Sequence, residues 1–307
     1  MKSKMERYTF EKFNREFPDD AACLEYLKNS LYPDGIHCAT CDKVTAHYRV
    51  ASRPSYSCQF CGNHVHPTAD TIFHKSSTSL RTWFYAVYLM SATRCGISAK
   101  QIERETGVTY KTAWRMFRQI RSMLNDETPL GGVGKKVEMD ESLIGARTKR
   151  KNTPQKERAT IFGMVERQGK VKAVVAPDRK MDTLRPLIRQ YVLPRTMVFT
   201  DDYASYDGLN IRGWRHRRIN HSAGIYVDGI LHTQTIEGFW SLVKNGIGGV
   251  YHSVSHKYLQ TYLDEYSFRY NHRRDTQPMF TSFLQQVEKR KVASEKPSLS
   301  PQESQPF

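Results

Sequence analysis

The sequence predicts an α/β fold, preceded along the chain by two small modules. Three patterns carry this prediction. Two Cys-x-x-Cys pairs stand in the first quarter of the chain, and two amphipathic helices joined by a glycine turn follow them. In the second half, short apolar runs of strand character alternate with helical segments. The 307 residues are enough for one α/β core and the two modules ahead of it.

Composition points to the class of partner. The formal net charge is +16 and the isoelectric point is about 9.6, which favours a polyanionic partner, most simply nucleic acid. Hydrophobic content of 39% and aromatic content of 11% indicate a folded chain rather than a disordered basic one. No apolar segment follows the basic N-terminus, and the longest apolar stretch is far too short to span a membrane. We therefore expect an intracellular, cytoplasmic protein with reduced cysteines.

The cysteine pairs predict a zinc ribbon. Cys38-x-x-Cys41 and Cys58-x-x-Cys61 are separated by 16 residues, and each turn directs two sulfurs at one ion. Three nearby histidines could substitute as ligands, namely His37, His64 and His66. Four cysteines already complete a tetrahedral site, so we predict a structural Zn²⁺ held by Cys38, Cys41, Cys58 and Cys61. Cys23 and Cys95 have no partner at ligand spacing and are expected to be ordinary buried residues.

A helix-turn-helix is predicted next. Ser98 and Gln101 form a capping box for a helix over 99–106, Gly107 makes the turn, and Thr109 caps a second helix that runs to about Leu124. In such modules the second helix contacts DNA. Its outer face offers basic side chains for phosphates and base edges, namely Lys111, Arg115, Arg118 and Arg121. The alternative is a helical hairpin whose basic face is solvated.

The second half of the chain predicts the α/β core. Strands are expected over 136–140, 159–166, 171–176 and 197–200, and helices over 182–191, within 232–245 and over 255–271, with Asp182 as the cap of the first helix. An antiparallel strand set, a helix, a further strand and closing helices fit a core of the ribonuclease H type. The predicted organisation is an N-terminal segment over 1–20, the zinc ribbon over 21–76, the helix-turn-helix over 77–127, the α/β domain over 128–287 and a disordered tail over 288–307.

Three carboxylates and one lysine are the candidate catalytic residues. Asp140 and Asp201 each end a predicted strand, and Glu237 shares a helix with Lys244, two turns away on the same face. Three separated carboxylates that a fold brings together suit two Mg²⁺ or Mn²⁺ ions, which cut and join phosphodiester bonds, and Lys244 would hold a phosphate there. Several acidic or amide residues remain as alternatives, namely Glu141, Asp202, Gln234, Asp228 and Glu265. Strand alternation directs Glu141 and Asp202 away from the side of their neighbours.

These residues together resemble a known family, the fifteen-ninety-five family of bacterial insertion-sequence transposases (ISXO-two-like), which join a zinc ribbon, a helix-turn-helix and a DDE catalytic domain. The resemblance extends to about residue 287, and the 35 residues between Asp201 and Glu237 are similar to the spacing in DDE enzymes. The matching residues are the two cysteine pairs, Thr71-Ile-Phe-His74, Val137-Glu-Met-Asp-Glu141, Thr200-Asp201, His232-Thr-Gln-Thr-Ile-Glu-Gly-Phe-Trp240, Lys244, Tyr251-His-Ser253 and Phe268-Arg-Tyr-Asn271.

The resemblance implies a ribonuclease H-like fold and Mg²⁺-dependent cleavage at the ends of an element, followed by transfer of a 3′-hydroxyl to target DNA. It implies binding of double-stranded DNA at terminal inverted repeats, a homo-oligomer in the DNA complex and a place at the bacterial nucleoid. Two other functions remain open on the residues alone. One is a DNA-binding regulator with an inactive core, and the other is a nuclease of the same fold that cuts without joining.

Overall fold

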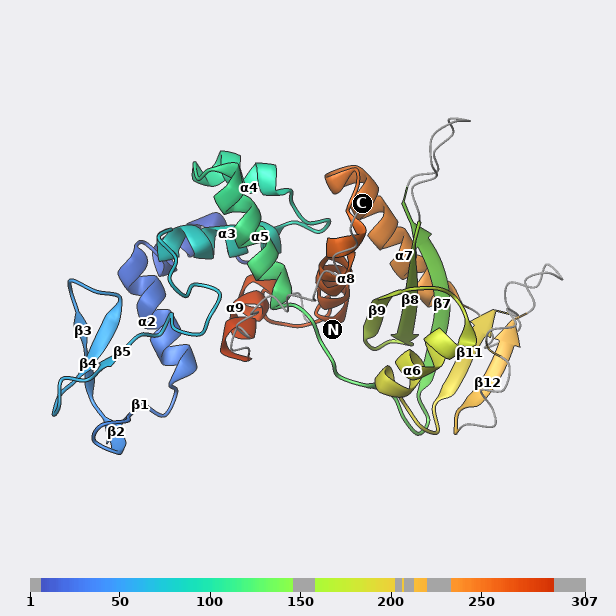
Figure 1. Ribbon diagram of the computed structural model, residues 1–307, viewed down its shortest axis with the longest axis horizontal. Coiled ribbons are helices and arrows are strands. Elements are labelled where there is room, and N and C mark those ends of the chain that lie inside the picture. The colour runs from blue at the N-terminus through green and yellow to red at the C-terminus, as the bar shows by residue number, and fades with distance from the viewer. Residues whose placement is uncertain (1–6, 146–157, 202–205, 207–212, 220–232, 290–307) are drawn as a thin grey trace, which may run out of the picture. The chain divides into compact units, whose positions relative to one another are not determined.

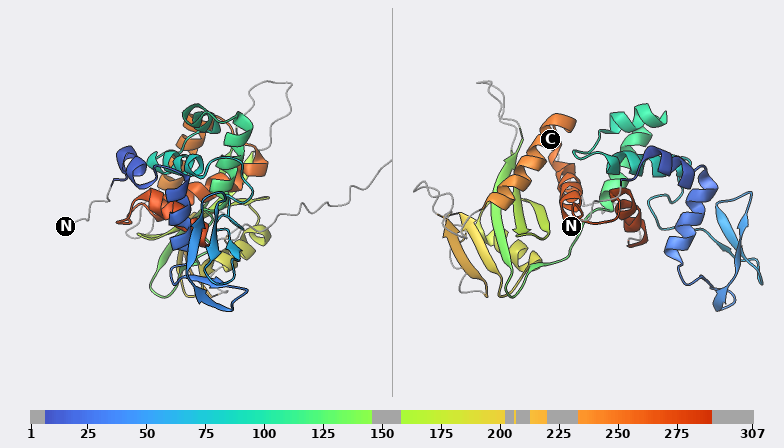
Figure 2. Two further views of the ribbon diagram at one scale, coloured as in Figure 1. Left: turned by 90° about the vertical axis from the view of Figure 1, so that its left-hand side faces the viewer. Right: turned by 180° about the vertical axis from the view of Figure 1, so that it is seen from behind.

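The computed structural model describes residues 7–145, 158–201, 206, 213–219 and 233–289 (Figures 1 and 2). Asp202, Asp228, His232 and residues 290–307 of the predicted tail lie outside the described residues. Backbone contacts divide the chain into two compact units. The ribbon unit comprises Thr9–Tyr85 and the segment from Phe283 on, and the sheet unit comprises Ala86–Ser282 with the residues before Thr9. In the described part of the chain, no helix has the length and apolarity needed to cross a membrane.

The ribbon unit contains two capped helices and two small antiparallel sheets. Thr9 and Asp19 accept backbone N–H groups at the starts of α1 (Phe10–Glu16) and α2 (Asp20–Leu31). One sheet pairs β1 (Ile36–Cys38) with β2 (Lys43–Thr45), and the other has the order β3 (His47–Val50), β4 (Ser55–Cys58), β5 (His64–Val65). Cys38 and Cys58 each end a strand, so each Cys-x-x-Cys turn follows one. Helix α3 (Leu80–Ala92) contributes residues to both units.

The predicted helix pair is present in the sheet unit. Helix α4 (Ala99–Thr106) begins at Ser98, whose hydroxyl accepts the Gln101 N–H at 3.2 Å. Gly107 ends it with a φ of 71°, a left-handed conformation that glycine adopts without strain. Helix α5 (Tyr110–Ser122) follows, with Thr109 as its N-cap. Because these helices belong to the same compact unit as the sheet, the predicted boundary at 127/128 divides one unit.

Arg121 corrects one prediction for α5. Its side chain is 1% exposed and pairs with Glu265 of α8 (His256–Asn271), Nε to Oε2 at 2.6 Å. The guanidinium also lies over the rings of Phe117 and Tyr262, at 3.6 and 3.5 Å from their centroids. Position 121 follows Phe117 by one helical turn and therefore lies on the buried face. The prediction that Arg121 contacts DNA is wrong, and Glu265, as the partner of Arg121 and Arg269, is no rival to Glu237.

A five-stranded mixed sheet forms the core of the sheet unit (Figure 1). Its order is β12 (Arg215–Ile219), β11 (Met197–Asp201), β7 (Lys136–Ile144), β8 (Ala159–Glu166), β9 (Val171–Ala176). Strands β7, β8 and β9 are antiparallel, while β11 runs parallel to both β7 and β12. A short parallel pair joins β6 (Leu130–Gly131) to β10 (Val192–Leu193). β7 continues four residues past its predicted end, so Asp140 lies inside the strand.

Strand alternation gives the sheet two distinct faces. Val137 and Met139 of β7 pack with Leu184 and Ile188 of α6 (Met181–Tyr191) on one face. Ile161 and Val165 of β8 pack with α7 (Gln234–Gly246), α8 and the π-helical turn η4 (Ile247–Tyr251) on the other. Asp182 does not cap α6, because the helix already begins at Met181 after Lys180. The even-numbered residues of β7 face α7, which decides where Asp140 lies.

Helix α8 also protects the edge of the sheet at β9. Gln260 accepts the Val175 N–H at 2.8 Å and donates to the Ala173 carbonyl at 3.1 Å. Asn271 does the same for Val171, at 2.7 and 3.1 Å. These amides satisfy the free backbone groups of an edge strand, which would otherwise be open to pairing. Helix α9 (Met279–Lys289) closes the described chain.

Candidate functional site

The four cysteines of the two pairs form a compact thiolate cluster. All four sulfurs lie within 4.8 Å of one another. Cys38 Sγ is 3.4 Å from Cys61 Sγ, and Cys41 Sγ is 3.9 Å from Cys58 Sγ. In a tetrahedral site with Zn–S bonds of about 2.3 Å, the sulfurs stand about 3.8 Å apart. The geometry therefore fits the predicted structural Zn²⁺ site.

The surroundings of the cluster shift the pKa values of its thiols in opposite directions. The Thr45 hydroxyl, 3.2 Å from Cys58 Sγ, lowers the pKa of that thiol to about 5. Hydrogen bonding to Cys61 raises the pKa of Cys41 to about 12, as expected when neighbouring sulfurs share a proton without a cation. His37 pairs instead with Asp42, and His64 contacts the Ser55 hydroxyl, so neither is needed as a ligand.

The two remaining cysteines differ in burial. Cys23 is buried in the ribbon unit, as predicted, whereas Cys95 is exposed, so the prediction for Cys95 is wrong. Cys95 follows the end of α3 and lies outside its apolar run.

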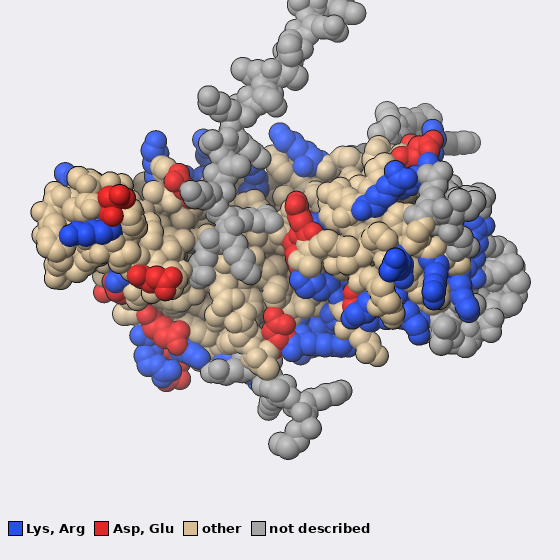
Figure 3. Space-filling view, turned by 90° about the horizontal axis from the view of Figure 1, so that it is seen from below, with Lys and Arg blue, Asp and Glu red and all other residues tan. Residues whose placement is uncertain are grey.

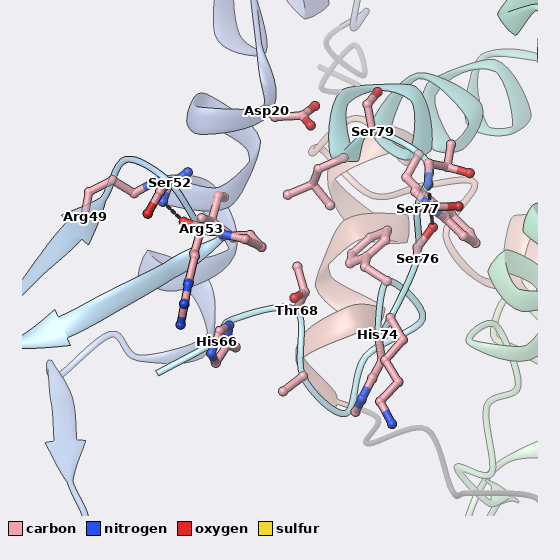
Figure 4. A pocket seen from close by; sticks show the side chains of 18 of the residues that line it. Asp20, Arg49, Ser52, Arg53, His66, Thr68, His74, Ser76, Ser77 and Ser79 are labelled. Atoms are coloured by element: carbon pink, nitrogen blue, oxygen red, sulfur yellow. Dashed lines mark hydrogen bonds between the residues drawn. The ribbon is translucent and has the colours of Figure 1, made fainter. Parts of the chain in front are cut away.

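The ribbon unit also contains a pocket of about 630 Å³ with a mixed polar and apolar lining (Figure 4). Arg49, Ser52 and Arg53, at the β3–β4 turn, line one side of it. Ser76, Ser77 and Ser79 line the opposite side. Arg49 is engaged with backbone carbonyls of its own turn, including that of Ser55. Cationic and hydroxyl groups that face one pocket can bind anions.

The structure places Asp140 on the α7 face of the central strand. Trp240 of α7 donates its indole N–H to Asp140 Oδ2 at 3.0 Å. Glu141, the next residue, lies on the other face and accepts a hydrogen bond from the buried Tyr206 hydroxyl. The alternation that the sequence predicts for these two neighbours is thus observed, and only Asp140 points toward α7.

Asp201 and Asp140 lie on neighbouring parallel strands. The pairing of β11 with β7 ends at Phe199 and Glu138. Each aspartate follows one of these two residues by two positions, so both lie just beyond the paired segment and on the same face as Phe199 and Glu138. Their charges interact, since Asp201 contributes to the raised pKa of Asp140.

Glu237 and Lys244 both lie on exposed positions of α7, two helical turns apart. The Thr233 hydroxyl donates to Glu237 Oε1 at 2.9 Å, and Trp240, on the same helix, is 3% exposed and anchors it in the core. Glu237 is close enough to Asp140 for its charge to raise the pKa of that aspartate. The structure therefore brings all three predicted carboxylates into one electrostatic group.

Crowding of like charges defines this group. Burial, the charge of Asp201 and, more weakly, that of Glu237 raise the pKa of Asp140 to about 6. Burial, with Asp140 and Asp201 nearby, likewise raises the pKa of Glu141 to about 7. Among the described residues, the cysteines are the only set of potential metal ligands whose ligand atoms all lie within 4.8 Å. The three carboxylates repel one another without forming such a set, and a bound cation would relieve this repulsion.

Two residues that sequence reasoning missed hold α7 over the strand. Gly163 stands opposite Asp140 on β8, and a Cβ there would lie 2.5 Å from the Trp240 ring. Glu138, two residues before Asp140, is fully buried and accepts the Thr235 and Ile236 N–H groups at 2.8 and 3.1 Å. Period-two alternation could have found Glu138, because it must share the face of Asp140.

Basic side chains surround the site and the helix pair. Lys111, Arg115 and Arg118 are exposed on α5, as predicted. The unpredicted strand β12 exposes Arg215, Arg217 and Arg218 beside β11, whereas His216 turns inward, 2.8 Å from the Thr200 hydroxyl. In Figure 3, several Lys and Arg side chains lie close together on the right of the view. A basic run without apolar alternation gave no strand signal.

Comparison with known proteins agrees with this arrangement. Residues 126–271 match the ISXO2-like transposase domain, and residues 18–64 match the transposase zinc-ribbon domain. An uncharacterized protein in transposable element ISH50 of Halobacterium salinarum is 26% identical over 278 residues, which cover 83% of this chain and 92% of the relative. An uncharacterized transposase-like protein of Haemophilus influenzae is 33% identical over 102 residues, which cover 33% of this chain and 81% of the relative. The chain belongs to the ISXO2-like transposase family.

Proposed function

We propose that this protein is a DNA transposase that cleaves the ends of an insertion sequence and transfers the 3′-hydroxyl to target DNA. The carboxylate group of Asp140, Asp201 and Glu237 carries the proposal, because such chemistry requires carboxylates near one another, and the charges of Asp201 and Glu237 both act on Asp140. The membership in a transposase family gives the substrate class.

The core supports the proposal through its topology. A mixed sheet in the order β9-β8-β7-β11-β12, antiparallel on one side of β7 and parallel on the other, is the arrangement expected of a ribonuclease H-like domain. The two aspartates lie on the adjacent parallel strands β7 and β11, and the glutamate lies on α7, which packs against β7. Each side chain thus comes from a rigid element, which fixes its direction.

The donor set suits divalent metal ions with hard oxygen ligands. Asp140, Asp201 and Glu237 would hold two Mg²⁺ ions, with waters and DNA phosphate completing the coordination. Bound there, the ions would activate the attacking oxygen and neutralise the leaving oxygen. The Trp240 indole N–H holds one oxygen of Asp140 in place, and the exposed Lys244 would bind a phosphate beside the carboxylates.

The DNA would be held by surfaces on both units. We assign the exposed face of α5, with Lys111, Arg115 and Arg118, to duplex contact at the terminal repeats, in the manner of a helix-turn-helix. The zinc ribbon would bind the same ends. The arginines of β12 border the strand that carries Asp201 and would neutralise phosphates near the reacting bond. Two copies of the chain would assemble to hold two ends.

Asp140→Asn tests the site. This variant retains the volume and the hydrogen bond from Trp240 but removes a negative charge that a metal ion needs. We expect Mg²⁺-dependent end cleavage to fall by at least about 10³-fold, with binding to a terminal-repeat duplex within about twofold of wild type. Glu141→Gln, which changes the neighbouring carboxylate on the other face, is the control and should retain most of the activity.

The same experiment distinguishes the two other functions. A DNA-binding regulator with an inactive core would bind the repeats but show no cleavage in Mg²⁺ or Mn²⁺ even as wild type. A nuclease of this fold would cleave without joining, so strand transfer must be measured beside cleavage. All three carboxylates are present in this chain, which favours an active enzyme over a regulator.

A further inference from the structure

Glu138 occupies a position that the proposed chemistry does not use. It lies on β7 two residues before Asp140, is 0% exposed, and faces α7. A buried carboxylate far from solvent needs several hydrogen bonds or an opposite charge, and removing it is costly where these are present. Glu138 has both.

Four donors saturate the Glu138 carboxylate. Oε2 accepts the Thr235 and Ile236 N–H groups, at 2.8 and 3.1 Å. Oε1 accepts the Thr235 hydroxyl at 2.9 Å and the Arg167 Nε at 2.7 Å. Two oxygens accept about four hydrogen bonds. Glu138 therefore has no lone pair left for a metal ion, and it cannot replace Glu237 as a ligand.

The start of α7 depends on this carboxylate. The first N–H groups of a helix have no partner inside the helix, and the N-cap side chain usually accepts them. Here the N-cap is Thr233, which makes no such bond. Its hydroxyl donates instead to Glu237 Oε1. Glu138 supplies the missing acceptor from the strand and adds a negative charge at the positive end of the helix.

Strand β7 thus carries both Asp140, a proposed metal ligand, and Glu138, which anchors α7. Helix α7 in turn carries Glu237, the third proposed ligand. Ile236 and Glu237 are adjacent, so an anchor on the Ile236 N–H holds the backbone next to Glu237. Trp240, one turn further on, contacts Asp140, and Gly163 leaves room for its ring. Arg167 holds Glu138 from the other side and lies over the Phe199 ring, at 4.3 Å, two residues before Asp201.

We propose that Glu138 is a positioning residue that sets the distance between Glu237 and the aspartate pair, so that the three carboxylates bind divalent metal together. This rests on the proposed metal-dependent function. Residues that orient metal ligands through hydrogen bonds change metal affinity or activity by about 10–100-fold when they are altered. A purely structural cap would change stability alone.

Glu166 provides a matched control. It lies at the end of β8, accepts the Gly131 N–H at 3.0 Å and pairs with Lys135 at 2.8 Å. Like Glu138, it anchors a neighbouring segment through backbone N–H donation and one cation, with one N–H group where Glu138 has two, but that segment carries no candidate ligand. Glu138→Ala and Glu166→Ala should both lower the melting temperature, which sets the structural baseline.

The deciding measurement is Mn²⁺ binding by calorimetry, together with the Mg²⁺ dependence of end cleavage, at a temperature where each variant is folded. We expect Glu138→Ala to weaken Mn²⁺ binding and to lower cleavage by about 10–100-fold, with Glu166→Ala close to wild type. Equal metal affinity in the two variants, or a loss in Glu138→Ala that only follows its stability, overturns the proposal.

Glu138→Gln guards against a variant that fails to fold. Glutamine retains the volume and can still accept both N–H groups, but its amide faces Arg167, so the cap remains and the ion pair is lost. We expect Glu138→Gln to lose less Mn²⁺ affinity than Glu138→Ala. Equal losses in the two variants would contradict the positioning role of the cap.

Asp140→Asn distinguishes failure of this proposal from failure of the proposed function. If Asp140→Asn binds Mn²⁺ as wild type does, the proposed metal-dependent function itself is wrong.

Discussion

The two candidate metal sites of this chain are built in opposite ways. The sulfur site takes its ligands from two short turns, and its four atoms lie within 4.8 Å of one another. The carboxylate site takes its ligands from two strands and a helix, and the hydrogen bond from Trp240 to Asp140 that supports it joins residues 100 positions apart. The first is an arrangement of local turns, whereas the second exists only where the sheet and α7 meet. Each should therefore fail under a different kind of change.

Loss of a single thiolate should have the largest effect. Cys58→Ser removes a ligand whose pKa is already lowered to about 5 by the Thr45 hydroxyl, and small zinc modules fold only with their metal. We expect loss of about one bound zinc per chain and rapid proteolysis between residues 36 and 65, with the sheet unit left folded. Zinc analysis and limited proteolysis measure this. Cys95→Ser, at an exposed cysteine, is the control and should retain both properties.

Breaking the buried ion pair of α5 should have the next largest effect. Arg121→Met leaves Glu265 with Arg269 as its remaining cation, so we expect a loss of about 3 kcal/mol of unfolding free energy, the low end for a broken buried pair. Denaturant unfolding measures it. The exposed neighbour Arg118→Met should instead leave stability unchanged and reduce the salt dependence of DNA binding by about one charge. The reverse result would restore Arg121 to the DNA surface.

A methyl group at Gly163 tests the long-range site without touching a carboxylate. The Cβ of Gly163→Ala would lie 2.5 Å from the Trp240 ring, so α7 must shift away from Asp140. We expect end cleavage to fall by about 10–100-fold while zinc content and repeat binding stay unchanged. Gly248→Ala, where a Cβ meets nothing within 4 Å, is the control. Wild-type cleavage in Gly163→Ala would mean that the α7 contact does not set the geometry of the site.

The smallest expected effect is on pH-dependent stability. The pKa of Asp140 is raised from 3.8 to about 6 in the folded protein. Its contribution to stability is therefore fully present below pH 3.8, the pKa in the unfolded chain, and is lost as pH rises through about 6. Metal-free wild type should therefore lose a few degrees of melting temperature between about pH 4 and pH 7, relative to Asp140→Asn. Thermal unfolding of both proteins at several pH values gives the difference. A constant difference across this range would show that Asp140 does not titrate there.

Local patterns were sufficient for the helix pair and for the cysteine cluster. The bounds of α4 and the capping roles of Ser98 and Thr109 agree with prediction, because each depends on neighbours within one turn. The prediction for Arg121 failed because periodicity places a residue on a face but does not say that a partner helix will cover it. Strand β12 was missed for a related reason, since an edge strand need not alternate.

The sequence by itself determined the ligands: four thiols in two turns, two aspartates on strands, and a glutamate and lysine on one helix. Their residue types and local spacing are fixed by the chain, and the zinc site follows from spacing alone. Only the tertiary structure decided which face each carboxylate takes and how α7 is held above β7. Glu138, Gly163 and Trp240 do this through contacts between residues 77 to 100 positions apart, and no local periodicity can specify such contacts.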